Sequence, residues 1–73
     1  MNTIEKLDEL WYAAPGTKVE YKGCIIEVKY YECDGVIEAD IPGEWVLWQD
    51  GMEVLVTDDV NDLKLYFNEE TNN

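Results

Sequence analysis

Carboxylates and aromatic rings are the side chains of this 73-residue chain that could do chemistry. The sequence holds 17 Asp and Glu residues against five Lys, for a formal charge of −12 at pH 7, and it contains no His, Ser or Arg. It therefore lacks the commonest general base, the commonest hydroxyl nucleophile and the bidentate clamp for an oxyanion. Acid–base work by paired carboxylates would need a deep cleft, for which so short a chain has little room. We expect a non-enzymatic binding protein that carries no cofactor.

The charge determines which partners are favourable. Binding to nucleic acid depends on cations that release phosphate counterions, and anionic membrane surfaces repel an acidic protein, so neither is expected as a direct partner. A basic protein surface is favoured instead. The acidic residues expected to meet it lie at turns and at outward strand positions: Asp34, Glu38, Asp40, Asp50, Glu53, Asp58 and Asp59.

Two aromatic residues are candidate anchors for such an interface. Desolvation of Trp48 and Tyr31 would supply affinity, whereas the charges would mainly speed association. Together with Glu53, the two rings could also form a cage for a methylated lysine or arginine through cation–π attraction. The simpler alternative is that so small a domain needs most of its rings for its core.

Neither a metal site nor a disulfide is expected. The segment from Asp58 to Asp62 has the composition of a calcium loop, but Leu63 stands where that loop requires Gly, so an acidic turn that caps its own backbone amides is favoured. Two cysteines without any histidine fall short of the four ligands of a zinc site. Cys24 and Cys33 flank what reads as one strand, which would separate them by roughly 30 Å, so we expect free thiols.

The clearest structural pattern is a β-hairpin over residues 45–57. Asp50-Gly51 separates two runs of β-branched and aromatic residues, and a two-residue Asp-Gly loop favours a type I′ turn. From the turn outward, the predicted cross-strand pairs are Gln49–Met52, Trp48–Glu53, Leu47–Val54, Val46–Leu55 and Trp45–Val56. One surface, the core side, would then carry Trp45, Leu47, Met52, Val54 and Val56. The second surface, with Val46, Trp48 and Leu55, would need a cover or a partner.

The remaining elements follow from periodicity. Apolar residues at helical spacing predict a helix over residues 3–13, which Pro15-Gly16 ends. Its apolar stripe would pack over a barrel mouth or over the second surface of the hairpin, or else dock into a partner's groove. Alternation predicts strands at 17–21, 24–32, 36–41 and 63–67, with a turn or a bulge at Lys22-Gly23 and a turn at Cys33-Asp34-Gly35. Residues 58–62 are expected to form a single helical turn, and residues 68–73 to fray.

Together these elements predict one mainly β domain, a small bent barrel of five or six strands over residues 17–67 with a short N-terminal helix. Three segments, residues 16–21, 46–54 and 59–63, resemble the Src-homology-3-like and Tudor-like small barrels. The resemblance implies a tight hairpin late in the chain and a helical turn just before a closing strand. For function, a Tudor-like barrel would imply a reader of cationic or methylated peptides.

The broad acidic field predicts a protein that blocks a basic, nucleic-acid-handling protein by occupying its groove. In size and charge the chain resembles small phage-encoded inhibitors of host nucleases, including anti-restriction and anti-CRISPR proteins. That resemblance implies a nucleic-acid mimic acting in the cytoplasm of a host cell, and the chain start lacks the basic and apolar regions of a signal peptide. The alternatives are the Tudor-like reader, a structural protein that forms a homodimer through the Trp48 face, and a charge that serves solubility alone.

Overall fold

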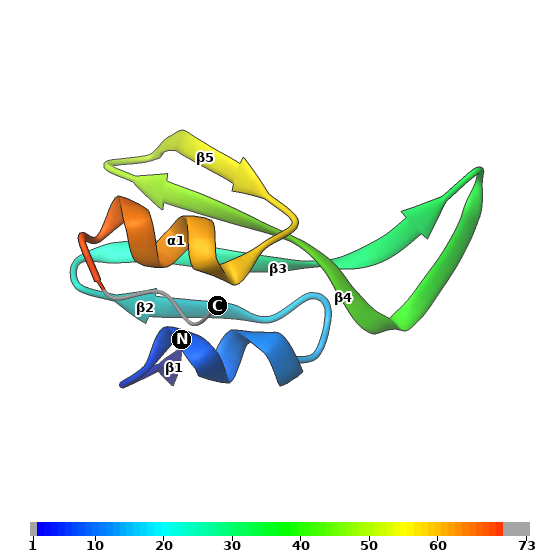
Figure 1. Ribbon diagram of the computed structural model, residues 1–73, viewed down its shortest axis with the longest axis horizontal. Helices are drawn as coiled ribbons and strands as arrows, with labels where there is room; N and C mark the ends of the chain where they lie inside the picture. Colours follow the sequence, from blue (N-terminus) through cyan, green and yellow to red (C-terminus); the bar gives the residue numbers. More distant parts are fainter. Residues whose placement is uncertain (1, 70–73) are drawn as a thin grey trace.

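The computed structural model describes residues 2–69, which form five strands, a 3₁₀ helix and an α-helix with their connecting turns (Figure 1). In chain order they are β1 (Asn2–Thr3), η1 (Leu7–Tyr12), β2 (Lys18–Tyr21), β3 (Cys24–Cys33), β4 (Val36–Gln49), β5 (Met52–Thr57) and α1 (Val60–Tyr66). The strands lie in one sheet in the order β1-β2-β3-β4-β5. β1 runs parallel to β2, and every other neighbouring pair is antiparallel. The expectation of a mainly β fold is confirmed.

Three two-residue turns connect the antiparallel strands. They are Lys22-Gly23, Asp34-Gly35 and Asp50-Gly51, and in each of them both residues have positive φ. Positive φ at both central positions is the requirement of a type I′ turn, whose twist matches that of the flanking strands. Glycine at the second position meets this requirement without steric cost. The turns at Asp34-Gly35 and Asp50-Gly51 agree with the sequence prediction, and of the turn or bulge predicted at Lys22-Gly23 the structure has the turn.

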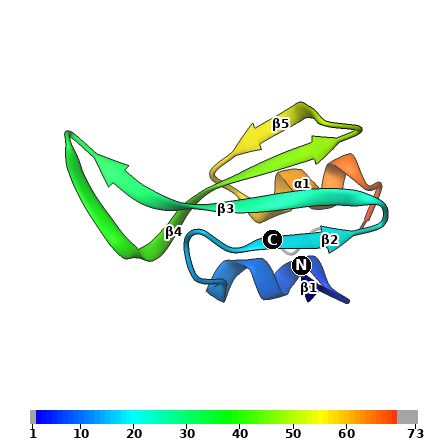
Figure 2. The same ribbon diagram turned by 180° about the vertical axis from the view of Figure 1, so that it is seen from behind.

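The sheet does not close into a barrel, so the finer part of the predicted architecture is wrong. Residues 63–66 of the predicted closing strand belong instead to α1, whose C-cap is Phe67, and β1 at one edge of the sheet contributes only two residues. Side chains of both helices pack against one face of the sheet, and no described helix covers the other face (Figures 1 and 2). The apolar face is therefore buried by helices rather than by the curling of the sheet onto itself.

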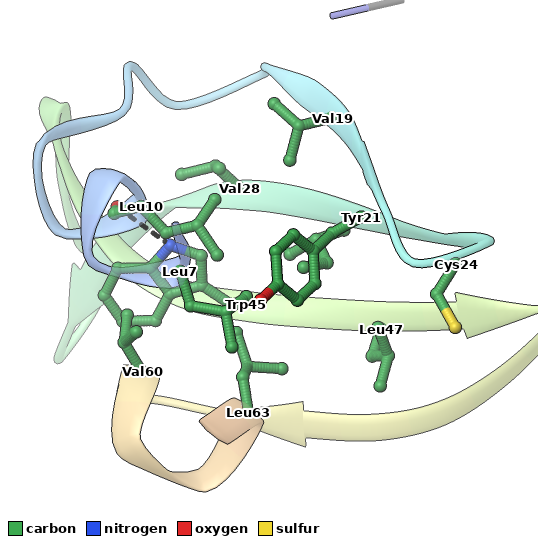
Figure 3. Close-up of a cluster of buried hydrophobic side chains, with 11 residues drawn as sticks. Leu7, Leu10, Val19, Tyr21, Cys24, Val28, Trp45, Leu47, Val60 and Leu63 are labelled. Carbon is green, nitrogen blue, oxygen red and sulfur yellow. Dashed lines mark hydrogen bonds between the residues drawn. The ribbon is translucent and has the colours of Figure 1, made fainter. Parts of the chain in front are cut away.

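Side chains from the sheet and both helices form one core (Figure 3). From the sheet come Val19, Tyr21, Cys24, Ile26, Val28, Trp45 and Leu47, and from the helices come Leu7, Leu10, Val60 and Leu63. The Trp45 indole Nε1 donates a hydrogen bond to the Leu10 carbonyl oxygen at 3.1 Å, which satisfies a polar group that burial would otherwise leave unpaired. Its ring also meets Trp11 edge-on, with a centroid distance of 5.3 Å.

The N-terminal segment differs from the predicted helix over residues 3–13. Asn2 and Thr3 pair with β2, and Ile4 N–H donates to the Glu20 carbonyl at 3.2 Å, so the helix begins only at Leu7 and is of the 3₁₀ type. Its start is capped by Glu9, whose carboxylate accepts from Lys6 N–H at 3.1 Å. The helix packs on the core face, not over the second surface of the hairpin, because Leu7 and Leu10 point into the core.

The hairpin β4–β5 keeps the predicted turn but not the whole predicted register. Gln49–Met52 and Trp48–Glu53 pair as predicted, and a bulge then shifts the pairing by one residue, so that Leu47 lies opposite Leu55 and Trp45 opposite Thr57. Leu55 and Thr57 consequently face the core. Met52, Val54 and Val56, which were predicted for the core side, are exposed. A one-residue slip moves a side chain to the other face of a sheet, and the bulge has this effect on Val54 and Val56. Met52 keeps its predicted pairing with Gln49 and is exposed at the end of the hairpin.

The segment predicted as a turn and a closing strand is α1. Asp59 is its N-cap, and the Asp59 carboxylate accepts from Asn61 N–H at 2.9 Å. At the other end Asn68 has positive φ, its N–H donates to the Leu65 carbonyl at 3.0 Å, and Glu69 N–H donates to the Lys64 carbonyl at 2.7 Å. This is the hydrogen-bond pattern of a Schellman motif. Residues 68 and 69 are thus held in place, contrary to the predicted fraying, and residues 70–73 lie outside the described residues.

Ion pairs tie the helices and the chain end to the rest of the domain. The buried Lys64 Nζ of α1 lies 2.6 Å from the Asp8 carboxylate of η1. Lys22 Nζ lies 2.8 Å from the Glu69 carboxylate, which also accepts a hydrogen bond from the Tyr21 hydroxyl. These two hydrogen bonds lower the pKa of Glu69 below its ordinary value of 4.5, and the bond from Lys22 has the larger effect.

This lowered pKa makes the contribution of Glu69 to stability dependent on pH. Its folded-state pKa lies below the unfolded value, so the contribution is present above about pH 4.5 and is lost as the pH falls through the folded pKa. We expect Glu69→Gln to be less stable than wild type at pH 7 and equally stable at low pH, measured by urea unfolding at both values. Glu53→Gln, which removes the same charge from an exposed position, is the control. An equal loss at both pH values would contradict the ionic contribution.

Candidate functional site

The distal part of the β3–β4 hairpin projects beyond the helices (Figures 1 and 2). We call residues 30–43 the acidic arm. It contains four carboxylates, Glu32, Asp34, Glu38 and Asp40, and no lysine or arginine. The chain is exposed at every one of the thirteen residues from Lys29 to Ile41. No other described segment of the chain combines such length, exposure and single-sign charge.

The arm is bent where it leaves the sheet. Glu38 pairs with Tyr31 and Pro42 pairs with Tyr30, so three residues of β4 bulge out between two consecutive residues of β3. Gly43 follows this bulge and passes very close to the Tyr31 backbone, for a Cβ atom at Gly43 would lie 2.4 Å from Tyr31 Cα. The absence of a side chain at Gly43 therefore permits β4 to pass close to the β3 backbone at Tyr31, and this close approach directs the arm out of the sheet. Residues 36–41, predicted as a separate strand, belong to β4.

Apolar side chains share the arm with the carboxylates. Its exposed large residues are Tyr30, Tyr31, Val36, Ile37 and Ile41. A two-stranded hairpin without a third strand or a helix against it is marginally stable in water, and exposed apolar groups on such a hairpin mark an interaction surface. The neighbouring Cys33 side chain raises the pKa of Tyr31 above 10.0, with smaller contributions from burial and Glu38. Tyr31 is therefore neutral at pH 7, and the charge of the arm comes from its carboxylates.

A groove of about 640 Å³ lies at the base of the arm. Tyr30, Tyr31 and Lys29 line it together with four carboxylates, those of Glu27, Glu32, Glu44 and Asp58. The acidic surface of the arm thus continues onto the sheet and to the end of β5. Among the described residues, no group of three or more His, Cys, Asp or Glu residues is arranged to hold a metal ion.

The predicted partner-binding residues fall into three places. Tyr31, Asp34, Glu38 and Asp40 lie on the acidic arm, Trp48, Asp50 and Glu53 lie at the opposite end of the sheet, and Asp58 and Asp59 join β5 to α1. Asp59 acts as the helix cap described above, so its carboxylate is engaged within the fold. Asp58 is exposed and lines the groove at the base of the arm.

The aromatic cage is not assembled. Trp48 lies opposite Ile25 of β3, and Tyr31 lies six residues farther along the same strand, which separates the two by roughly 20 Å. Glu53 is the cross-strand neighbour of Trp48 and is equally remote from Tyr31. The three residues therefore cannot surround one cation.

Sequence reasoning missed the apolar half of the arm and most of the groove. Ile37, Ala39 and Ile41 read as the apolar face of an ordinary strand, because alternation alone does not reveal whether a hairpin lies within the sheet or beyond it. One signal in the sequence did indicate a projecting hairpin. The alternating segments before and after Asp34-Gly35 are longer than those of the neighbouring strands, so part of them has no strand to pair with beyond the hairpin itself.

The two cysteines occupy opposite ends of β3 and are free thiols, Cys24 buried in the core and Cys33 exposed on the arm. No described helix is long and apolar enough to cross a membrane. Comparisons of the chain with protein-family models, with curated proteins and with solved structures found no match.

Proposed function

We propose that this protein binds the basic groove of a nucleic-acid-handling protein through its acidic arm and so blocks the groove. The observation that carries the proposal is the arm itself, an exposed hairpin with four carboxylates and no basic residue. Such a surface is complementary to the lysine- and arginine-lined grooves that bind nucleic acid.

The spacing of charge along the arm supports this choice of partner. From Tyr30 to Asp34 the arm extends for about 13 Å at about 3.3 Å per residue. Its four carboxylates, which lie on both sides of the hairpin, give about one charge per 3.3 Å of arm, comparable to one strand of a duplex at about 3.4 Å per charge and half the density of the whole duplex at about 1.7 Å. The exposed tyrosines and isoleucines beside the carboxylates would supply the contacts that slow dissociation.

The test compares two variants that lose equal charge. One neutralises two carboxylates of the arm (Asp34→Asn, Glu38→Gln), and the control neutralises two exposed carboxylates that lie outside the arm, its groove and the far end of the sheet (Glu5→Gln, Glu20→Gln). Nucleic-acid-binding proteins captured from a lysate by wild type are purified, and their binding kinetics are measured with and without duplex DNA. We expect the arm variant to associate about tenfold more slowly and the control nearly as fast as wild type, because steering depends on where the charge lies.

Competition decides the mechanism. Duplex DNA and this protein should exclude each other from the captured partner, and rising salt should weaken the complex. A stable ternary complex of partner, DNA and this protein would overturn the proposal, since a mimic and the molecule it mimics cannot occupy one groove together. Equal loss of association rate in the two variants would show that net charge, rather than the arm, drives binding.

A further inference from the structure

A second concave site lies at the end of the sheet opposite to the arm. It has a volume of about 320 Å³ and lies between two turns, Lys22-Gly23 and Asp50-Gly51. Its lining includes Ile25 and the half-buried ring of Trp48, together with Lys18, Glu27 and Asp50. Ile25 and Trp48 are cross-strand neighbours, and their chain neighbours Ile26 and Leu47 face the core, so the pair lies on the opposite face of the sheet. No described helix covers that face (Figure 2). We call this site the Trp48 pocket.

The Trp48 pocket combines an aromatic ring with an excess of negative charge. Lys18 lies directly opposite Glu27 in the register of β2 and β3, so these two charges offset each other. Asp50 at the adjoining turn and Glu53 opposite Trp48 add two further carboxylates. A cationic occupant is therefore favoured over a neutral or anionic one. A second copy of this chain is disfavoured, because each copy carries a formal charge of −12.

The side chains that line the Trp48 pocket favour arginine over lysine as the cationic occupant. A guanidinium is planar, stacks on aromatic faces, is weakly hydrated and can bind a carboxylate with two parallel hydrogen bonds. An ammonium group is compact and strongly hydrated, so it gains less from a mostly apolar wall. A volume of about 320 Å³ is also near the lower limit for ligand sites, which suits one side chain better than a larger molecule.

We propose that the Trp48 pocket receives an arginine side chain from a basic protein partner, with the guanidinium stacked on Trp48 and hydrogen-bonded to the carboxylate of Asp50. This site is separate from the acidic arm, and the inference holds whether or not the arm occupies a nucleic-acid groove. Its consequence for specificity is that the protein selects arginine-bearing surfaces from among surfaces of equal charge.

Two synthetic peptides of one design provide the test, with three arginines or three lysines separated by Gly-Ser spacers. Their affinities are measured by calorimetry for wild type, Trp48→Leu and Tyr31→Leu. Wild type should bind the arginine peptide about fivefold more tightly, the size of effect expected for a cation on an exposed indole. Trp48→Leu keeps an apolar side chain but removes the ring, so the preference should vanish. Tyr31→Leu removes an exposed ring from the arm and should leave the preference unchanged.

A measurement on wild type keeps the test valid if Trp48→Leu folds poorly. Addition of the arginine peptide should shift the indole N–H resonance of Trp48, while that of the buried Trp45, bonded to Leu10, stays in place. Equal affinity of wild type for the two peptides would overturn the inference, as would a preference that survives in folded Trp48→Leu. Loss of the preference in Tyr31→Leu would place arginine recognition on the arm. Dimerisation of the protein that the peptide reverses would identify a second copy as the occupant and would likewise overturn it.

Discussion

Leu63→Ala should destabilise the protein by about 2–5 kcal/mol, whereas Leu65→Ala should cost less than about 0.5 kcal/mol. In α1 the Leu63 side chain is completely buried in the core, while Leu65 is 65% exposed. Had residues 63–67 formed a strand, the two leucines would have pointed to the same face of the sheet and would have cost similar amounts. The pair of variants therefore reports directly on the helix.

The expected loss for Leu63→Ala is a large part of the total stability. Domains gain about 0.05–0.15 kcal/mol per residue on folding, which gives about 4–11 kcal/mol for a chain of this length. We would measure urea unfolding by tryptophan fluorescence, since the core contains Trp45. The Leu65→Ala variant is the matched control, with the same chemical change two residues along the same helix. Equal destabilisation of the two variants would contradict the packing of α1.

Gly43→Ala should destabilise the protein by about 1–3 kcal/mol and displace the acidic arm. The new Cβ would lie 2.4 Å from Tyr31 Cα and 3.0 Å from Tyr31 N, closer than non-bonded atoms tolerate. The contact is with the backbone, so no rotation of a side chain relieves it. Either β4 separates from β3 at this point or the arm changes its direction, and binding through the arm should weaken in both cases.

Thermal unfolding and amide hydrogen exchange over residues 30–43 would reveal the change. Ala39→Val adds bulk at an exposed position of the same strand and should alter stability by less than about 0.5 kcal/mol. Tyr31→Ala should not rescue Gly43→Ala, because it leaves the Cα and N atoms of Tyr31 in place. A rescue, or wild-type stability of Gly43→Ala itself, would show that β4 does not cross Tyr31 as closely as described.

Local patterns in the sequence were enough to place most strands and two of the three turns, and they left a turn or a bulge open at Lys22-Gly23. Lys22 has positive φ in the structure although lysine rarely adopts it. A type I′ turn needs two consecutive residues that tolerate positive φ, and Asp34-Gly35 and Asp50-Gly51 meet this requirement without reference to the rest of the fold. Alternation placed β2 and β3 for the same reason, since the period of a strand is a property of neighbouring residues. The acidic character of the arm was likewise evident, because exposed turns hold charge at little cost.

The identity of α1 could not be decided locally. Its residues fit both periods, with Leu63, Leu65 and Phe67 alternating as in a strand and Val60, Leu63 and Phe67 recurring as in a helix. The N-cap at Asp59 was the only local sign that favoured the helix. As a helix the segment covers the apolar face of the sheet, and as a strand it would extend or close the sheet. Which of the two is more stable depends on the other elements of the fold, so the segment's own sequence does not determine it.

The same reasoning explains the candidate sites. The sequence by itself determined a mainly β protein with an acidic surface, because composition and short-range periodicity fix those properties. Tertiary structure decided that Tyr31 and Trp48 lie roughly 20 Å apart, that a bulge turns Val54 and Val56 outward, and that residues 30–43 leave the sheet. Each of these outcomes depends on a register between strands, and a register is set by contacts between residues distant in the chain.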